Sequence, residues 1–152
     1  MQASMAATTT LPGPPLLQPL GDCGLIVRFA SELSEAGNRA AVAFARRLGS
    51  GLPEGVTEVD PNLISVLLKY DPAKTGYERL AGEVRLLLGA EGAGALPAER
   101  HVVRVRFGGV GGPDLAEVAA TLRMTPEVFV AAHTASPLRV LTTGFAPGFV
   151  YC

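Results

Sequence analysis

LISVLLKY, at Leu63–Tyr70, is a mostly apolar run that ends at Asp71-Pro72. A run of this kind, closed by a turn-forming pair, favours a β-strand. GLIVRF, at Gly24–Phe29, has the same β-branched and apolar character, and the shorter GVTEV follows at Gly55–Val59. We therefore expect three strands in this part of the chain.

Two helices are expected beside these strands. Ser34 and Thr75 each stand before a segment with apolar residues at helical spacing, and a hydroxyl there can cap the first turn. Gly49 ends the first of these segments. The order strand, helix, strand, strand, helix predicts an α+β fold, with a small split β-α-β sheet and its helices on one side. The apolar positions are Ala40, Ala41, Phe44, Ala45 and Leu48 in the first helix, and Leu80, Val84, Leu87 and Leu88 in the second.

The chain divides into four parts by composition. Residues 1–20 contain four prolines and no Lys or Arg, so we interpret them as a disordered leader and not as a signal peptide. We expect residues 21–90 to form the α/β N-terminal domain and the Gly- and Ala-rich residues 91–99 to form a linker. Residues 100–152 begin a second domain.

The second domain opens with HVVRVRF, whose alternation of apolar and polar residues predicts a half-buried strand. A glycine-rich bend follows, and two short helices come next. Asp114 is placed to cap the first of these helices, and Thr125-Pro126 begins the second. The expected elements are a strand at His101–Phe107, a bend at Gly108–Gly112, helices at Leu115–Leu122 and through Ala132, and a strand at Leu138–Thr142.

Charge and composition exclude several classes of protein. The formal net charge is −1, so the chain lacks the basic excess of a nucleic-acid binder. Cys23 and Cys152 have no second Cys or His at ligand spacing, which predicts free thiols in a reducing cytoplasm and no metal site. No run of 18 apolar residues occurs, so no membrane span is expected.

One segment has the rhythm of a helix-turn-helix, the motif of many DNA-binding proteins. It is LAEVAATLRMTPEVFVAAH, at Leu115–His133. A recognition helix needs donors for phosphates and base edges, yet the second helix here carries no Lys or Arg. The composition therefore argues against DNA binding.

The best candidate site is GFAPGF, at Gly144–Phe149. Gly148 can take the positive φ that a tight turn requires, and Pro147 presets the preceding angle. Phe145 and Phe149 flank this turn and can wall a pocket. The same residues are also compatible with a purely structural barrel corner packed by aromatic rings.

Two titratable residues are further candidates. His133 can transfer protons near neutral pH, or it can simply stabilise a helix end through the helix dipole. Asp114 can contribute to a site or serve as a helix cap. The residues alone leave both alternatives open.

Four segments, in this order, resemble the family of the 5-oxoprolinase B component, also called allophanate hydrolase subunit 1, with its carboxyltransferase C/D domain and its sporulation-kinase-inhibitor relatives. The most specific feature is GPDL, followed by His133 and then by GF-x-PGF-x-Y. The segments are Gly21-Asp22, Asp60-Pro61 through Ser65 to Tyr70-Asp71-Pro72, Gly112-Pro113-Asp114-Leu115, and Gly144–Tyr151.

The resemblance implies an α/β domain followed by a cyclophilin-like β-barrel, which residues 100–152 would only begin. It also implies a subunit of an ATP-dependent enzyme that opens 5-oxoproline to glutamate together with companion subunits. ATP would be used by the assembled enzyme, and the substrate would be a small molecule. We expect His133 and Asp114 to be catalytic, with the substrate bound by Gly144, Phe145, Pro147, Gly148, Phe149 and Tyr151.

The chain also departs from the family's pattern. Arg104 stands where the family has Pro, Leu138 stands where it has Tyr, and the sequence stops at Cys152 where the family continues into the barrel. Two other functions therefore stay open. One is an interaction protein that inhibits a histidine kinase, and the other is an inactive truncated remnant.

Overall fold

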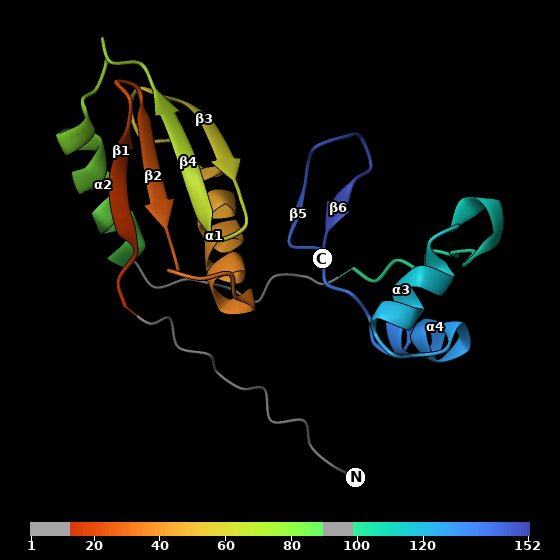
Figure 1. Ribbon diagram of the computed structural model, residues 1–152. Coiled ribbons are helices and arrows are strands. Elements are labelled where there is room, and N and C mark those ends of the chain that lie inside the picture. Colours follow the sequence, from red (N-terminus) through yellow and green to blue (C-terminus); the bar gives the residue numbers. More distant parts are fainter. Residues whose placement is uncertain (1–12, 90–98) are drawn as a thin grey trace. The chain divides into compact units, whose positions relative to one another are not determined.

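The computed structural model describes residues 13–89 and 99–152. These residues form two compact units (Figure 1). The first contains residues 13–89 together with Leu141–Tyr151, and the second contains residues 99–140 and Cys152. The division differs from the expected one, because the segment with the GFAPGF turn belongs to the first unit and not to the second.

The first unit is built on a four-stranded sheet. Its strands are β1 (Leu16–Leu20), β2 (Gly24–Arg28), β3 (Val56–Pro61) and β4 (Ser65–Tyr70), in the order β1-β2-β4-β3 with antiparallel neighbours. Both β2 and β3 run antiparallel to β4 between them, so they are parallel to each other. Helix α1 (Glu35–Leu48) connects them, which confirms the split β-α-β arrangement.

Helices α1 and α2 (Tyr77–Gly89) cover one face of this sheet (Figure 1). Ser34 caps α1 as expected, because its Oγ accepts a hydrogen bond from the Gly37 N–H at 3.2 Å. Side chains from both helices and from β2, β3 and β4 share one core. Its buried members are Leu25, Val27, Phe29, Ala41, Phe44, Leu48, Val56, Val66, Leu68, Tyr70, Leu80 and Val84.

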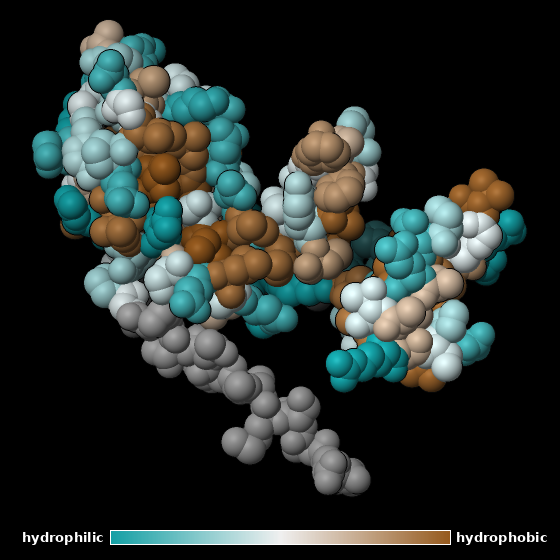
Figure 2. All heavy atoms as spheres, in the orientation of Figure 1, coloured by the Kyte–Doolittle hydropathy of each residue, from teal (hydrophilic) through white to brown (hydrophobic). Residues whose placement is uncertain are grey.

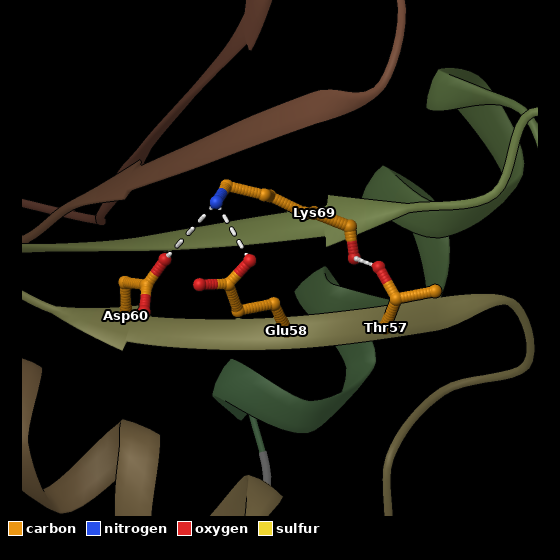
Figure 3. Close-up of polar contacts among 4 residues, drawn as sticks. All are labelled: Thr57, Glu58, Asp60 and Lys69. Carbon is orange, nitrogen blue, oxygen red and sulfur yellow. Dashed lines mark hydrogen bonds and ion pairs between the residues drawn. The ribbon is translucent and has the colours of Figure 1, made fainter.

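The other face of the sheet is partly polar, since successive strand residues point to opposite sides. Lys69 projects from β4 and its Nζ lies 2.6 Å from Glu58 Oε2 and 3.8 Å from Asp60 Oδ2 on β3 (Figure 3). The hydrogen bond between Lys69 and Glu58 lowers the pKa of Glu58 and raises that of Lys69. Charges on β3 also discourage pairing of this edge strand with other chains.

Strand β1 corrects the expectation of a disordered leader over residues 1–20. It pairs with β2 along its whole length, and the Tyr77 hydroxyl on α2 donates a hydrogen bond to Leu17 O at 3.3 Å. Pro19 is tolerated because β1 lies at the edge of the sheet, where a missing N–H leaves no ladder bond unmade. Residues 1–12 lie outside the described residues, as do residues 90–98, which cover most of the expected linker.

The expected cap of the second helix is wrong. Helix α2 begins at Tyr77, two residues after Thr75, and the Leu80 N–H bonds to Gly76 O. Thr75 is buried, and its Oγ1 has no hydrogen-bond partner among the described residues. The Thr75 side chain instead fills the space beside Gly55, where an added Cβ would lie 2.8 Å from its methyl carbon.

The second unit consists of a short 3-10 turn at Gly109–Gly111 and two helices, α3 (Leu115–Thr121) and α4 (Pro126–Thr134). Helix α4 begins at Thr125-Pro126 as expected, and the Thr125 Oγ1 caps it by accepting from the Val128 N–H at 3.3 Å. Asp114 occupies the cap position of α3, but its side chain makes no capping hydrogen bond, which corrects that expectation. Among the described residues of this unit, only Ala119 belongs to the buried apolar set.

The strand expected at His101–Phe107 is also wrong. These residues have no regular structure, and Val102 is 87% exposed. Alternation produces a strand only where a neighbouring strand satisfies its N–H and C=O groups, and none of the described residues supplies one here. The strand expected at Leu138–Thr142 is reduced to β5 (Thr142–Thr143), which pairs with β6 (Val150–Tyr151). From residue 99 onward, the described chain contains this ladder and forms no barrel.

Over the two described ranges, no helix has both the length and the apolar character needed to cross a membrane.

Candidate functional site

The GFAPGF segment is a hairpin loop between β5 and β6, and it contains two consecutive tight turns. The ladder pairs Thr142 with Tyr151, and the Gly144 N–H donates to Phe149 O at 3.3 Å. The second turn closes with a hydrogen bond from the Phe149 N–H to Ala146 O at 3.0 Å. Pro147 and Gly148 are its central residues, and Gly148 has φ +80°, which is the pattern of a type II β-turn. The expected positive φ at Gly148 is therefore confirmed.

The first turn is more unusual because its central residue is Phe145. The Ala146 N–H donates to Gly144 O at 2.8 Å, which closes a three-residue γ-turn, and Phe145 has φ +65°. A non-glycine residue in this conformation costs on the order of 1–3 kcal/mol. Phe145 is also 91% exposed, so burial of its ring does not compensate for the backbone strain. Strained residues of this kind cluster at ligand-binding sites.

Three aromatic rings form a continuous strip on this hairpin, which we call the aromatic strip: Phe145, Phe149 and Tyr151. The centroids of Phe145 and Phe149 lie 5.6 Å apart, those of Phe149 and Tyr151 lie 5.2 Å apart, and both pairs meet edge to face. Phe149 and Tyr151 keep 46% and 42% of their surface exposed. The hairpin therefore presents an accessible aromatic surface with a fixed geometry.

In the second unit, His133 lies in the last turn of α4 and contacts two phenylalanine rings. It stacks on Phe129 at 5.9 Å and meets Phe107 edge to face at 5.6 Å. The imidazole remains exposed and is accessible to a bound molecule. The carboxylate of Asp114, at the start of α3, is exposed as well and makes no capping hydrogen bond.

An open depression of about 410 Å³ lies on the same unit. Phe107 belongs both to its wall and to the ring contacts of His133, and Leu115 of its wall directly follows Asp114. Its lining residues are Phe107, Leu115, Pro126, Glu127, Val130 and Ala131. His133 and Asp114 are thus each adjacent to one wall residue of a largely apolar depression.

Glu127 adds a negative charge to this depression. Hydrogen bonds from its own backbone N–H and from the Thr125 side chain lower the pKa of Glu127. Both donors lie at the N-terminal end of α4, where unpaired N–H groups favour a carboxylate. One edge of the depression therefore carries a carboxyl group with a lowered pKa.

The structure brings together some of the expected site residues. Phe149 contacts both Phe145 and Tyr151. Gly144, Pro147 and Gly148 shape the turns that hold these rings. His133 and Asp114 belong to the other unit, and no direct contact joins these two side chains. Among the residues in the described ranges, no three His, Cys, Asp or Glu side chains gather as metal ligands would.

Sequence reasoning missed three residues that contact His133 or line the depression. Phe129 precedes His133 by four residues, and that helical spacing is a signal for the stacking. Phe107 ends a predicted strand, and that interpretation gives no sign of its contact with His133. Glu127 follows the capping Thr125 by two residues, and its place in the first turn indicates a low pKa.

The chain is similar to known proteins. The family model of the carboxyltransferase domain, subdomain C and D, matches residues 15–152. The B component of the 5-oxoprolinase of Bacillus subtilis (strain 168) is 30% identical over 147 residues, which are 89% of this chain and 61% of that protein.

The chain is also similar to solved structures. Two crystal forms of TTHA0988 are 33% and 36% identical to this chain, each with a TM-score of 0.62. They cover 83% and 85% of this chain but only 23% and 24% of TTHA0988. The chain therefore spans about three fifths of its curated relative and a quarter or less of the crystallised one. With the family model matching nearly every residue, the chain belongs to the carboxyltransferase domain family, subdomain C and D.

Proposed function

We propose that this chain is a subunit of an ATP-dependent 5-oxoprolinase-type amidohydrolase, which opens 5-oxoproline to glutamate together with companion subunits. The observation that carries the proposal is the exposed aromatic strip, held by a strained turn, in a relative of a 5-oxoprolinase component. Phe145, Phe149 and Tyr151 would contact the substrate, with Gly144, Pro147 and Gly148 fixing their geometry.

The chemistry of the substrate supports this assignment. 5-Oxoproline is a five-membered lactam with several C–H groups, which suit the faces and edges of aromatic rings. Hydrolysis adds water to the lactam carbonyl, breaks the C–N bond, and leaves an amine after the nitrogen takes a proton. An exposed imidazole such as His133 can deliver that proton, and the Asp114 carboxylate can orient the attacking water. We propose these two residues as the catalytic groups of this chain.

We propose that ATP is bound by a companion of this chain in the assembled enzyme. The only glycine-rich bend in the described ranges covers residues 108–112, and no Lys or Ser/Thr follows it as a P-loop requires. The Gly112 N–H of this bend already bonds to Gly109 O, and the Leu115 N–H that follows the bend bonds to Gly112 O. The bend therefore does not fit a nucleotide phosphate.

Reconstitution tests the proposal. The purified chain is mixed with the companion subunits of a related 5-oxoprolinase, and ATP hydrolysis is measured with and without 5-oxoproline. The full-length relative of this chain from that enzyme serves as the positive control. ATP hydrolysis that rises only when chain and 5-oxoproline are both present would support the proposal. A working control with no response to this chain would refute it.

A second candidate is a protein that inhibits a histidine kinase by binding. Apolar side chains reach the surface of the second unit (Figure 2), and four of them on or between α3 and α4 are 40–52% exposed. These are Val118, Leu122, Met124 and Val128. Exposed apolar side chains near one another favour a protein partner. Inhibition of kinase autophosphorylation by the purified chain, without any response to 5-oxoproline, would select this function.

A further inference from the structure

Asn38 is a buried polar residue on the core-facing side of α1. Only 1% of its surface is exposed, and its helical neighbours Gly37 and Ala41 are buried too. Its backbone N–H is already used by the helix, where it donates to Ser34 O at 3.0 Å. A buried side-chain amide is costly unless its polar atoms are satisfied, so its partners indicate what it does.

The side-chain amide of Asn38 joins two segments that are far apart in sequence. Its Nδ2 donates to Leu63 O at 2.8 Å and to Leu141 O at 2.9 Å, which lie 25 and 103 residues away along the chain. Both partners are carbonyl oxygens, which only accept. A side chain at this position must therefore supply two donors from one atom, and the NH₂ group of Asn does so.

Leu141 is the residue that leads into the candidate site. It directly precedes β5, and its own N–H donates to Tyr151 O at 2.8 Å. Its peptide groups are thus held from two sides, by Asn38 through the carbonyl and by the strand with Tyr151 through the N–H. Within the first unit, this contact ties the hairpin of the aromatic strip to α1.

We propose that Asn38 is a positioning residue, which fixes the hairpin Leu141–Tyr151 on α1 and so sets the placement of the aromatic strip. Its importance for catalysis rests on the proposed function, but its effect on the hairpin does not. Asn38 acts on the substrate-binding residues through the Leu141 carbonyl, to which its amide donates.

Hydrogen exchange followed by NMR tests the inference on the full chain. Asn38→Leu keeps a similar volume but removes both donors. We expect the amides of Leu141 and Gly144 to exchange about tenfold faster, relative to the Tyr70 amide, because each hairpin opening now breaks one buried hydrogen bond fewer. Ser34→Ala is the matched control, since it weakens the same helix through its cap without touching Leu141. Equal hairpin-to-Tyr70 ratios in both variants would overturn the inference.

A measurement on the unsubstituted chain covers the case in which Asn38→Leu does not fold. The side-chain amide protons of Asn38 should show nuclear Overhauser contacts to Leu141 or Thr142, and their absence would overturn the inference. In the reconstituted enzyme, Asn38→Leu should lower kcat/KM for 5-oxoproline about tenfold, mainly through KM, while Ser34→Ala should not. The two proposals can fail separately. If hairpin amides exchange faster in Asn38→Leu but the unsubstituted chain never responds to 5-oxoproline, the proposed function is refuted and the role of Asn38 stands.

Discussion

Gly148 allows the geometry of the site to be tested with a single methyl group. Its φ of +80° lies in the region that L side chains rarely adopt, and a Cβ added there would meet nothing within 4 Å. The cost of Gly148→Ala therefore comes from backbone conformation and not from a steric clash. That cost is about 1–2 kcal/mol, and the reduced entropy of the unfolded chain offsets about 0.4–1 kcal/mol of it.

Gly144 provides the matched control in the same hairpin. It also has open space around an added Cβ, but it has no positive φ. Opening of the second turn exposes the Phe149 N–H, which bonds to Ala146 O. We expect this amide to exchange about three- to tenfold faster in Gly148→Ala and not to exchange faster in Gly144→Ala, with NMR exchange rates as the assay. Equal rates in the two variants would refute the positive φ at Gly148 as the source of the effect.

Three further outcomes are expected. Leu25→Ala, which truncates a fully buried core side chain, should lower the free energy of unfolding by about 2–5 kcal/mol in urea titrations, whereas Leu16→Ala on the exposed edge strand should cost less than about 1 kcal/mol. Because the pKa of Glu58 is lowered in the folded chain, its contribution to the free energy of unfolding is complete above the ordinary pKa of 4.5 and is lost as the pH falls through the lower folded pKa. Lys69→Met should therefore reduce the loss of stability in acid, as measured by urea titrations at several pH values. An unchanged pH dependence of stability would contradict this expectation. Thr125→Ala should lower the helicity of α4 seen in NMR chemical shifts, through loss of a cap worth about 1 kcal/mol, while Thr121→Ala should not.

Local signals predicted the first unit well. Ser34 caps α1 because a hydroxyl at that position needs only the next few residues to act. Phe44 and Leu48 are buried because helical spacing places them on one face, and Val66 and Leu68 alternate into the same core. The split β-α-β topology follows from the order of these elements.

Tertiary pairing explains what the sequence could not predict. β1 contains a proline and is mostly exposed, so only its pairing with β2 and the Tyr77 bond to Leu17 make it a strand. His101–Phe107 has a better alternating pattern, yet without a neighbouring strand it stays irregular. Whether a segment forms a strand thus depends more on a neighbouring strand to pair with than on the alternation of its apolar and polar residues.

The sequence predicted the turn of the candidate site, but not the conformation of Phe145 or the contact of Asn38 that holds the hairpin. Pro147-Gly148 is a turn signal with a local mechanism, and the structure confirms it. The positive φ of Phe145 has no such signal, because phenylalanine does not favour that region. The role of Asn38 depends on two backbone carbonyls distant in sequence, and no pattern of residue types can indicate such partners.

The most direct test of the proposed function is 5-oxoproline-dependent ATP hydrolysis by the reconstituted enzyme with Phe149 replaced by Ala. Phe149 is the central ring of the aromatic strip and contacts both of the others. Val150→Ala is the control, because alternation along β6 points Val150 away from that face. We expect Phe149→Ala to lower kcat/KM for 5-oxoproline at least about tenfold, as for a lost aromatic contact, with Val150→Ala close to the unsubstituted chain. Equal kcat/KM values in the two variants would contradict a substrate-binding role for the aromatic strip.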